Sequence, residues 1–389
     1  MNNPNFKETN KTTIENIEWI SDVLVYTLKN ISNAFYLACI IDKKNIEIYK
    51  YIYESKAFKN IGKINIINYY YTSMKYFYNP LNKQEYFFII NENDEIEIYL
   101  IKNENNFELI QKLKFINKDD INENNNNDNI LINIDEDNND NNTDSIAGDT
   151  FTSFNYLDVL YDENNKNVYV IINYLIMQNA GGSMSSLDCY NSKSNNIYIF
   201  KDEKLNLIKT FKYDIDFNVN NITYIKNNLN KKYLIDAHNT NDLILIEIKP
   251  NYNNYEIENM FNDDNNKNIL SNFIKSQCYY DSCIIYGRNN FDYLYVSEGN
   301  KLMIINLTQK NIDVIDFNQI YLRNIYNWDK NYLIFFQIGE IYIYDITKNK
   351  IITRNKKENC IGFRSYHFQD KNEALGIFKY YDKIECYFV

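Results

Sequence analysis

The sequence predicts an all-β chain made of similar four-stranded antiparallel units, and three observations support this fold class. Short runs rich in Ile, Tyr, Phe, Leu and Val alternate with clusters of Asn, Asp and Lys, as strands and turns do. No stretch has the apolar spacing of a convincing amphipathic helix. One phrase, a polar residue followed by alternating aliphatic and other residues, has seven copies, at residues 45–49, 95–99, 196–200, 242–246, 301–305, 340–344 and 383–387. Such a repeat in a chain of 389 residues predicts one seven-bladed β-propeller.

Each copy of the phrase is predicted to be the third strand of its unit, and the sixth unit shows the order clearly. Residues 324–328 form an inner strand, and residues 331–337 are nearly all apolar, as in a strand buried on both faces. A tight turn at Ile338-Gly339 leads into the phrase at 340–346, and 350–354 form the outer strand. Nine glycines and three prolines are too few for all the turns, so Asn and Asp must supply many of them.

Five further units follow the same order of inner, second, third and outer strand. Their predicted strands are 23–28, 35–41, 45–51 and 58–66; 70–78, 86–91, 95–101 and 107–115; 154–161, 168–174, 196–201 and 205–211; 222–226, 233–237, 242–248 and 255–261; and 278–286, 293–297, 301–307 and 311–317.

The last unit has only three strands, at 363–368, 374–380 and 383–389, before the sequence ends. Residues 12–20, a strand-like run before the first unit, belong to no other unit. We therefore expect this N-terminal run to complete the last blade and close the ring, which would leave no open sheet edge between the first and last blades.

The predicted organisation is a polar N-terminal tail at 1–11 and a single propeller domain at 12–389. The Asn- and Asp-rich loop 117–150 is expected to be disordered because it has little apolar surface to bury. Further insertions are predicted at 177–194 and 262–276. All three would emerge on one face of a propeller, where insertions often mark a binding side. The alternative is that a biased composition simply fills tolerant loops with Asn.

Composition limits the partners and the compartment. A net charge of −11 and a pI near 4.9 disfavour direct nucleic-acid binding. The sequence shows no secretory signal and no transmembrane segment. Six scattered cysteines suit a reducing compartment better than a disulfide framework. We expect an intracellular, cytoplasmic protein, with the nucleus as an alternative.

Residues able to carry catalysis are sparse. The two histidines have no spacing partner for a metal, and no phosphate-binding or nucleophile motif is present, so no enzyme activity, cofactor or metal is predicted. Arg323, Arg354 and Arg364 stand near the connections that flank the last two units, and could form a partner site or ordinary salt bridges. Met184 and Leu187, in the 177–194 insertion, are further candidates for partner binding.

The segment Ile341-Tyr342-Ile343-Tyr344-Asp345 resembles the WD40 repeat, with Tyr344 where that family usually has Trp. The Gly-His pair of that family is absent, and the one Trp-Asp pair, Trp328-Asp329, ends an inner strand. We therefore expect apolar packing to stabilise the blades. The resemblance implies a scaffold that presents rim loops to other proteins, as a subunit of a hetero-complex.

Two alternatives come from other functional classes. One is a propeller that binds phosphoinositides at a membrane surface, although its Phe-Arg-Arg-Gly signature is missing and Gly287-Arg288 stands alone. The other is a propeller enzyme with a site at the channel mouth, for which His367 is the only suggestively placed residue.

Overall fold

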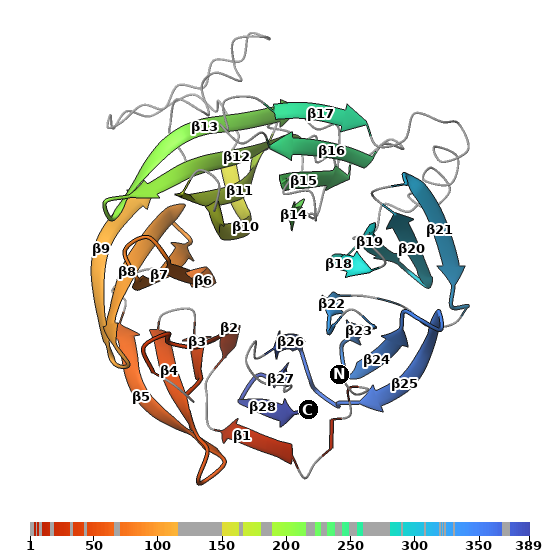
Figure 1. Cartoon of the computed structure of the whole chain (residues 1–389), viewed down its shortest axis with the longest axis horizontal. Coiled ribbons are helices and arrows are strands. Elements are labelled where there is room, and N and C mark those ends of the chain that lie inside the picture. Colours follow the sequence, from red (N-terminus) through yellow and green to blue (C-terminus); the bar gives the residue numbers. More distant parts are fainter. Residues whose placement is uncertain are drawn as a thin grey trace, which may run out of the picture. The chain divides into compact units, whose positions relative to one another are not determined.

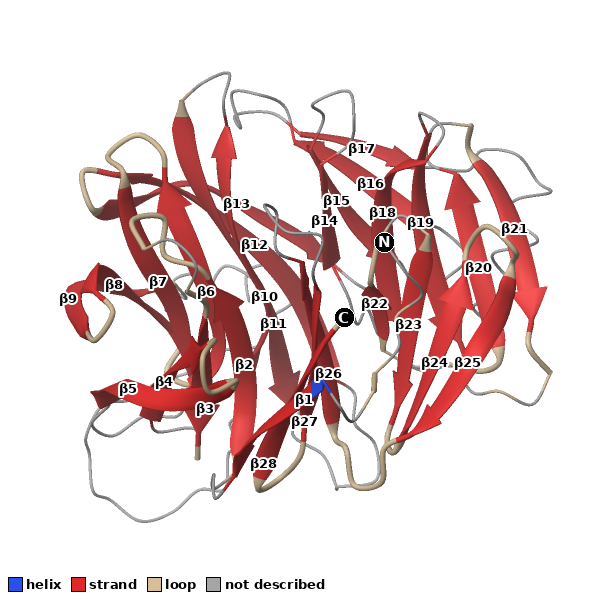
Figure 2. Ribbon diagram, turned by 60° about the horizontal axis from the view of Figure 1, so that its bottom comes forward, coloured by secondary structure: helices blue, strands red, loops and turns tan. Residues whose placement is uncertain are grey.

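The described residues of the chain are arranged mainly in β-strands. The computed structural model describes residues 4, 6–7, 10–15, 19–31, 34–42, 45–65, 71–115, 150–162, 166–179, 189–214, 222–226, 232–237, 243–248, 255–259, 281–288, 291–306, 309–318, 320, 322, 324–329, 331–367 and 374–389. These residues form strands and turns, with one short 3₁₀ piece at Asn10 and no α-helix (Figure 2). Among them, no helix is long and apolar enough to cross a membrane.

The described strands form seven four-stranded antiparallel sheets, six of which are consecutive meanders. These six are β2 (Ile20–Tyr26), β3 (Tyr36–Ile41), β4 (Asn45–Ile52) and β5 (Ala57–Asn65); β6 (Tyr71–Asn79), β7 (Gln84–Asn91), β8 (Glu95–Asn103) and β9 (Asn106–Lys114); β10 (Thr150–Asp162), β11 (Asn167–Asn179), β12 (Cys189–Lys201) and β13 (Lys204–Asp214); β14 (Ile222–Lys226), β15 (Lys232–Ala237), β16 (Leu243–Ile248) and β17 (Tyr255–Asn259); β18 (Asp281–Arg288), β19 (Phe291–Glu298), β20 (Lys301–Asn306) and β21 (Asn311–Asp316); and β22 (Ile325–Asn327), β23 (Tyr332–Gln337), β24 (Glu340–Asp345) and β25 (Lys350–Lys356).

The seventh sheet joins the two ends of the sequence. Its order is β1-β28-β27-β26, from β1 (Lys11–Glu15), β28 (Lys383–Phe388), β27 (Ala374–Lys379) and β26 (Gly362–His367). Strand β1 pairs antiparallel with β28, from Lys11 opposite Tyr387 to Glu15 opposite Lys383, and Figure 1 shows the red β1 beside the blue β28. The first part of the N-terminal run predicted at 12–20 therefore supplies the fourth strand of the last sheet, whereas Ile20 begins β2.

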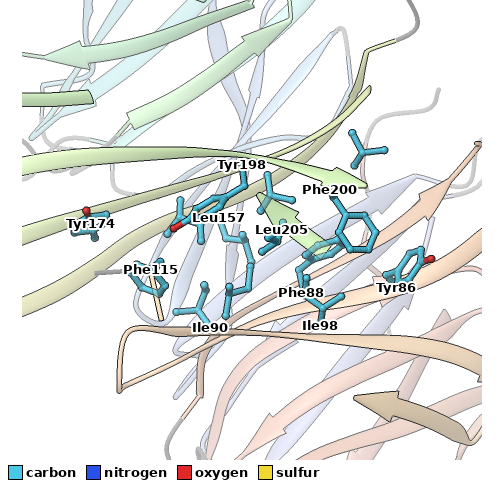
Figure 3. Packing of buried hydrophobic residues seen from close by; sticks show 14 of the residues in the cluster. Tyr86, Phe88, Ile90, Ile98, Phe115, Leu157, Tyr174, Tyr198, Phe200 and Leu205 are labelled. Atoms are coloured by element: carbon cyan, nitrogen blue, oxygen red, sulfur yellow. The ribbon is translucent and has the colours of Figure 1, made fainter. Parts of the chain in front are cut away.

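The chain divides into two compact units. One consists of Met1–Tyr71, Lys102–Phe107 and Phe217–Val389, and the other of Thr72–Ile101 and Glu108–Asp216. The second unit has its own apolar core, in which side chains from β7, β8, β11, β12 and β13 interdigitate (Figure 3). Tyr86, Phe88 and Tyr174 in this core are fully buried. In the run 331–337, predicted to be buried on both faces, Leu333 to Phe336 in β23 are almost inaccessible to solvent.

Turns rely on residues other than glycine, as the composition predicts. Asp42, Asp94 and Asn349 have φ values of 47°, 59° and 50°, in the left-handed region that Asn and Asp tolerate. Lysines also take this conformation, at Lys56 and Lys310 among others.

The predicted loops differ from the structure at one place. The insertion expected at 177–194 is shorter, because β11 continues to Asn179 and β12 begins at Cys189, with Met177 paired to Asn191. Backbone pairing extends this hairpin through residues whose polar side chains suggested a loop. Residues 117–149 and 262–276, the other two insertions, lie outside the described residues.

A side-chain hydrogen bond recurs in the third strands, besides the apolar packing that was expected. In four copies of the phrase, a tyrosine hydroxyl donates a hydrogen bond to the glutamate two residues earlier, which lies on the same face of the strand. The pairs are Tyr49 with Glu47 (2.6 Å), Tyr99 with Glu97 (2.8 Å), Tyr387 with Glu385 (3.0 Å) and Tyr342 with Glu340. We call this arrangement the Glu-x-Tyr pair.

The outer strand completes each Glu-x-Tyr pair with a donor to the same carboxylate. Asn60 reaches Glu47 at 2.9 Å, Lys112 reaches Glu97 at 3.4 Å, Arg354 reaches Glu340 at 2.6 Å and Lys11 reaches Glu385 at 3.7 Å. Three of these donors, namely Asn60, Arg354 and Lys11, stand directly opposite the tyrosine in the strand register. A hydrogen-bonded carboxylate therefore links the third and outer strands of these sheets, in addition to the apolar packing that the sequence predicts.

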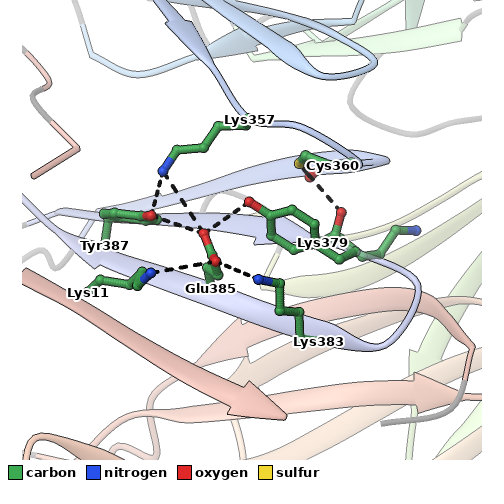
Figure 4. Close-up of polar contacts among 9 residues, drawn as sticks. Lys11, Lys357, Cys360, Lys379, Lys383, Glu385 and Tyr387 are labelled. Carbon is green, nitrogen blue, oxygen red and sulfur yellow. Dashed lines mark hydrogen bonds and ion pairs between the residues drawn. The ribbon is translucent and has the colours of Figure 1, made fainter. Parts of the chain in front are cut away.

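Glu385 is the most heavily bonded of these carboxylates (Figure 4). It accepts from Tyr380 at 2.9 Å and from Lys383 at 2.9 Å, besides Tyr387 and Lys11. Its burial would raise its pKa, but the hydrogen bonds from Lys383, Tyr380 and Tyr387 outweigh this effect and lower the pKa. The ionised form is thus the one that the folded state stabilises.

Asp345, which stands at the WD-like position of the phrase, has a local role. Its Oδ1 accepts from the backbone N–H of Thr347 at 2.9 Å and from the Thr347 hydroxyl at 2.6 Å, and its Oδ2 accepts from Lys348 at 2.8 Å. The carboxylate therefore holds the turn between β24 and β25, while its side chain is almost fully buried. Burial would raise its pKa, but the bonds from Lys348 and Thr347 prevail and lower the pKa to about 2.

Replacing Glu385 by Ala is expected to lower the free energy of unfolding by about 2–4 kcal/mol, because two tyrosine hydroxyls and nearby ammonium groups lose their shared acceptor. Urea denaturation at neutral pH measures this loss. Glu54→Ala, at an exposed position, serves as the control and should stay within about 0.5 kcal/mol of the parent protein. Equal effects of the two changes would contradict the assigned role of Glu385.

The lowered pKa of Asp345 predicts acid sensitivity. The folded pKa of Asp345 is about 2, below the ordinary value of 3.8. The stabilisation of the folded state by ionised Asp345 is therefore complete above pH 3.8 and disappears as the pH falls through 2. Asp345→Asn should therefore lower the free energy of unfolding at about pH 6 and have progressively less effect toward about pH 2. Denaturation at several pH values tests this, with the exposed Asp382→Asn as control. A pH-independent difference would contradict the prediction.

Candidate interaction surface

The structure describes two of the five residues predicted to bind partners. Arg354 and Arg364 lie in β25 and β26, while Arg323, Met184 and Leu187 lie outside the described residues. The two described arginines lie in different sheets and have different partners. Arg354 pairs with the carboxylate of Glu340, and Arg364 pairs with the carboxylate of Asp22. The partner-binding role of all five residues stays a prediction.

Arg354 belongs to a Glu-x-Tyr pair. Its Nη2 lies 2.6 Å from Oε1 of Glu340, and its guanidinium stands 5.6 Å from the centre of the Tyr342 ring. The hydrogen bond from Arg354 lowers the pKa of Glu340. With 57% of its side chain exposed, Arg354 keeps much of its surface open to solvent while it ties β25 to β24.

Arg364 links the first strands of three sheets. Its Nη2 lies 3.4 Å from Oδ1 of Asp22 in β2, and its Nη1 donates to the hydroxyl of Tyr326 in β22 at 3.3 Å. The guanidinium also stands 5.8 Å from the centre of the Tyr326 ring. Its side chain is 53% exposed, so it remains partly open to solvent.

A second cation joins β2 to the last sheet beside this arginine. Nζ of Lys379, at the end of β27, donates to the backbone carbonyl of Ser21 at 2.8 Å. Partial burial lowers the pKa of Lys379. The start of β2 is therefore held by two basic side chains of the last sheet, through its backbone and through the Asp22 carboxylate.

Two exposed aromatic rings lie next to these contacts along the chain. Trp19 directly precedes β2, and Tyr381 lies in the turn between β27 and β28. Their ring centres are 5.3 Å apart, and each side chain is 53% exposed. The carbonyl of Trp19 accepts a hydrogen bond from the backbone of Asp42 at 2.7 Å, which fixes the backbone at this point.

Trp19 and Tyr381 were missed from the sequence, although a weak signal exists for the tyrosine. Tyr380 and Tyr381 are consecutive in the turn after β27, where two neighbouring rings cannot easily occupy the same buried site. Tyr380 is the buried one and donates to Glu385, whereas Tyr381 is exposed. For Trp19, the exposure of the ring comes from the structure alone.

The contacts Trp19–Tyr381, Ser21–Lys379 and Asp22–Arg364 all join the start of β2 to the last sheet, and we call their residues together the Trp19 surface: Trp19, Ser21, Asp22, Arg364, Lys379 and Tyr381. Trp, Tyr and Arg are the residue types that dominate the binding energy of protein interfaces. Their exposed rings supply apolar area, and the cations supply directional contacts to carboxylates. In the described part of the chain, no three His, Cys, Asp or Glu side chains are grouped as a metal site would require.

The comparisons with known proteins show the fold. No family model matches the chain, and no curated protein sequence matches it. Solved structures do match over nearly the full length. The AfRom2 CNH domain shares 10% identity at a TM-score of 0.53, covering 98% of this chain and 99% of its own. The structure of BBS1N in complex with ARL6DN shares 10% identity at 0.55, covering 96% and 93%. Sqt1 of Saccharomyces cerevisiae shares 8% identity at 0.53, covering 97% and 98%.

This chain has a β-propeller fold. The likeness covers the whole length, and it agrees with the repeated four-stranded antiparallel sheets. Identities of 8–10% carry no information about which partners the chain binds.

Removing either described arginine is expected to leave the propeller folded. Exposed ion pairs contribute about 1 kcal/mol or less, so Arg354→Ala and Arg364→Ala should each lower the free energy of unfolding by no more than that. Urea denaturation measures the change. A loss above about 2 kcal/mol would show that the arginine is a structural residue, and its alanine variant would then be unsuitable for binding assays.

Proposed function

We propose that the chain is a seven-bladed, WD40-like β-propeller that binds other proteins and has no catalytic activity. Seven four-stranded sheets in the described residues support the blade number. The pairing of β1 with β28 supports closure of the ring by strands from both ends of the sequence. The fold itself is shared with propellers that include BBS1N, which was solved in complex with ARL6DN.

The exposed contact between Trp19 and Tyr381 is the observation that carries the proposed function. Two aromatic rings, each 53% exposed and 5.3 Å apart, offer apolar area that water covers in the free protein. Arg364 stands in the same unit and is anchored by Asp22 and Tyr326, so its guanidinium is already oriented. A preorganised group of this kind loses little conformational entropy when a partner docks.

In the proposed mechanism, the sheets hold the partner-binding side chains in fixed positions. The backbone hydrogen bond from Asp42 holds Trp19, and the short turn between the paired strands β27 and β28 holds Tyr381. The partner contributes apolar side chains to the rings and a carboxylate or carbonyl to Arg364. In a closed propeller, β2, β22 and β26 are the innermost strands of their blades, so this partner would dock near the central channel. The protein would then act as a subunit of a hetero-complex, with an intracellular location suited to its buried free thiols Cys39, Cys360 and Cys386.

Changing Trp19 and Tyr381 together to Ala is expected to remove bound partners. The tagged chain would be purified from its native cells, and bound proteins would be quantified by mass spectrometry. Partners that use the Trp19 surface should fall at least about tenfold, because aromatic anchors commonly contribute more than 1 kcal/mol each. The double variant Leu81→Ala, Ile338→Ala, which alters exposed apolar residues elsewhere, is the matched control.

The proposal is contradicted if the Trp19→Ala, Tyr381→Ala variant and the control variant bind the same proteins in equal amounts, whether those amounts are reduced or unchanged. Circular dichroism and the unfolding midpoint confirm that each variant is folded before the comparison. Adding Arg323→Ala, Arg354→Ala and Arg364→Ala in a third variant tests whether the arginines contribute to the same partners.

A further inference from the structure

The segment before β1 inserts one aromatic ring into a pocket of the last two sheets. Phe6 is only 9% exposed, although its neighbours in the sequence are mostly polar. Its ring centre lies 5.1 Å from that of Phe378 and 5.5 Å from that of Trp328. Phe363 and Tyr387 complete the enclosure, each at 5.9 Å. All four contacts are edge-to-face, the geometry that aromatic quadrupoles favour.

Gly376 in β27 leaves room for the Phe6 ring because it has no side chain. A Cβ atom added to Gly376 in β27 would overlap Cε1 of Phe6 and lie 3.1 Å from its Cδ1. Any side chain at this position would therefore displace the ring. Gly62, by comparison, would meet its nearest neighbour, Asn105, at an ordinary 3.4 Å. The Phe6 pocket thus fits an aromatic side chain only because residue 376 is glycine.

The same segment continues as a strand added to the edge of a sheet. β1 pairs with β28 over five residues, from Lys11 to Glu15. Thr12 and Ile14 are buried, and Ile14 joins the apolar cluster beneath β3 and β28. Lys11 approaches Glu385 at 3.7 Å, as Figure 4 shows, and Asn10 donates to the carbonyl of Phe388 at 3.2 Å.

Phe6 and β1 therefore contact the last two sheets as a bound peptide would. Main-chain pairing along β28 supplies affinity, and two apolar pockets, for Phe6 and for Ile14, supply specificity. None of these contacts requires that the segment belong to the same molecule. The partner that satisfies all of them is a second copy of the same segment, because its sequence already matches the register and both pockets.

We propose that the Phe6 pocket and the β28 edge form a peptide-binding site whose occupant, the chain's own segment 4–15, is exchangeable with the same segment of a second copy of this chain. The ligand class is an extended peptide with a Phe that precedes a Lys-Thr-Thr-Ile-Glu strand. Exchange of an identical element between copies requires no new interface chemistry.

Peptide exchange in a cleavable full chain tests the site. A protease recognition sequence is inserted after Glu15, the chain is cleaved, and a fluorescent peptide of residues 1–15 is added. The peptide is expected to bind the cleaved chain, as measured by fluorescence anisotropy, and to bind the uncleaved chain much more weakly. A Phe6→Ala peptide should bind at least about tenfold more weakly, from the apolar area it no longer buries. Equal binding of the two peptides, or no binding of either, overturns the proposal.

A double-mutant comparison in the uncleaved chain tests the pocket without requiring exchange. Gly376→Ala should lower the melting temperature strongly when Phe6 is present and much less in a Phe6→Ala background, because the overlap is then gone. Gly62→Ala, whose added methyl makes only ordinary van der Waals contacts and none with Phe6, should show the same effect in both backgrounds. Additive effects of Gly376→Ala and Phe6→Ala would overturn the assigned contact.

A mixing experiment tests whether a second copy of the chain can supply the segment. It combines a chain with an empty Phe6 pocket, the acceptor, with a chain whose own pocket is blocked, the donor. The cleaved chain, freed of its peptide by dilution, is the acceptor. The uncleaved Gly376→Ala chain is the donor, because its own pocket is obstructed while its Phe6 is intact. Size-exclusion chromatography should show a mixed dimer, and a donor that carries both Gly376→Ala and Phe6→Ala should give much less. If the free peptide exchanges but no mixed dimer forms, a second copy is rejected as the occupant.

Discussion

The pairing of β1 with β28 is the contact on which the rest of the fold depends. Without it, the last sheet would have three strands and β28 would present an unpaired edge of backbone groups. The contact joins residues as far apart as Asn10 and Phe388, 378 positions along the sequence, so it forms only after a costly loop closure. Apolar side chains on both sides of the strand pair, Ile14 and Phe6 among them, supply the free energy that offsets this cost.

The repeated phrase predicted most of the strands because alternation and turn residues are local properties. The three-stranded last unit even predicted which N-terminal run completes it. Local patterns did not predict that Phe6 is buried, since its pocket is made by residues more than three hundred positions away, from Trp328 to Tyr387. They also did not predict that β11 and β12 extend into the 177–194 region, because backbone pairing does not depend on apolar side chains there.

The Glu-x-Tyr pair shows a signal that was visible and not used. Glu97-Ile98-Tyr99 and Glu340-Ile341-Tyr342 stand in the repeated phrase itself, and a period of two places both polar groups on one face. Their donors come from the outer strand, whose register against the third strand cannot be deduced from sequence alone. A chain that lacks the Gly-His and Trp-Asp signatures thus holds its third and outer strands with a different polar group. Arg364 was a candidate from the sequence and its partner-binding role stays a prediction, whereas the exposure of Trp19 and Tyr381 depends on how separate sheets meet.

The N-terminal segment and Trp19 are close in the sequence, and both contact the region around β28. Trp19 follows β1 by four residues, and its ring contacts Tyr381 in the turn that leads into β28, the strand that pairs with β1. This contact keeps the segment close to its own pocket, with an effective concentration on the order of millimolar for a short connection. A second copy at micromolar concentration would compete about a thousandfold less well, so release of the segment, and not protein concentration, would govern exchange. A partner that separated Trp19 from Tyr381 would lower that effective concentration, which couples occupation of the Trp19 surface to opening of the Phe6 pocket.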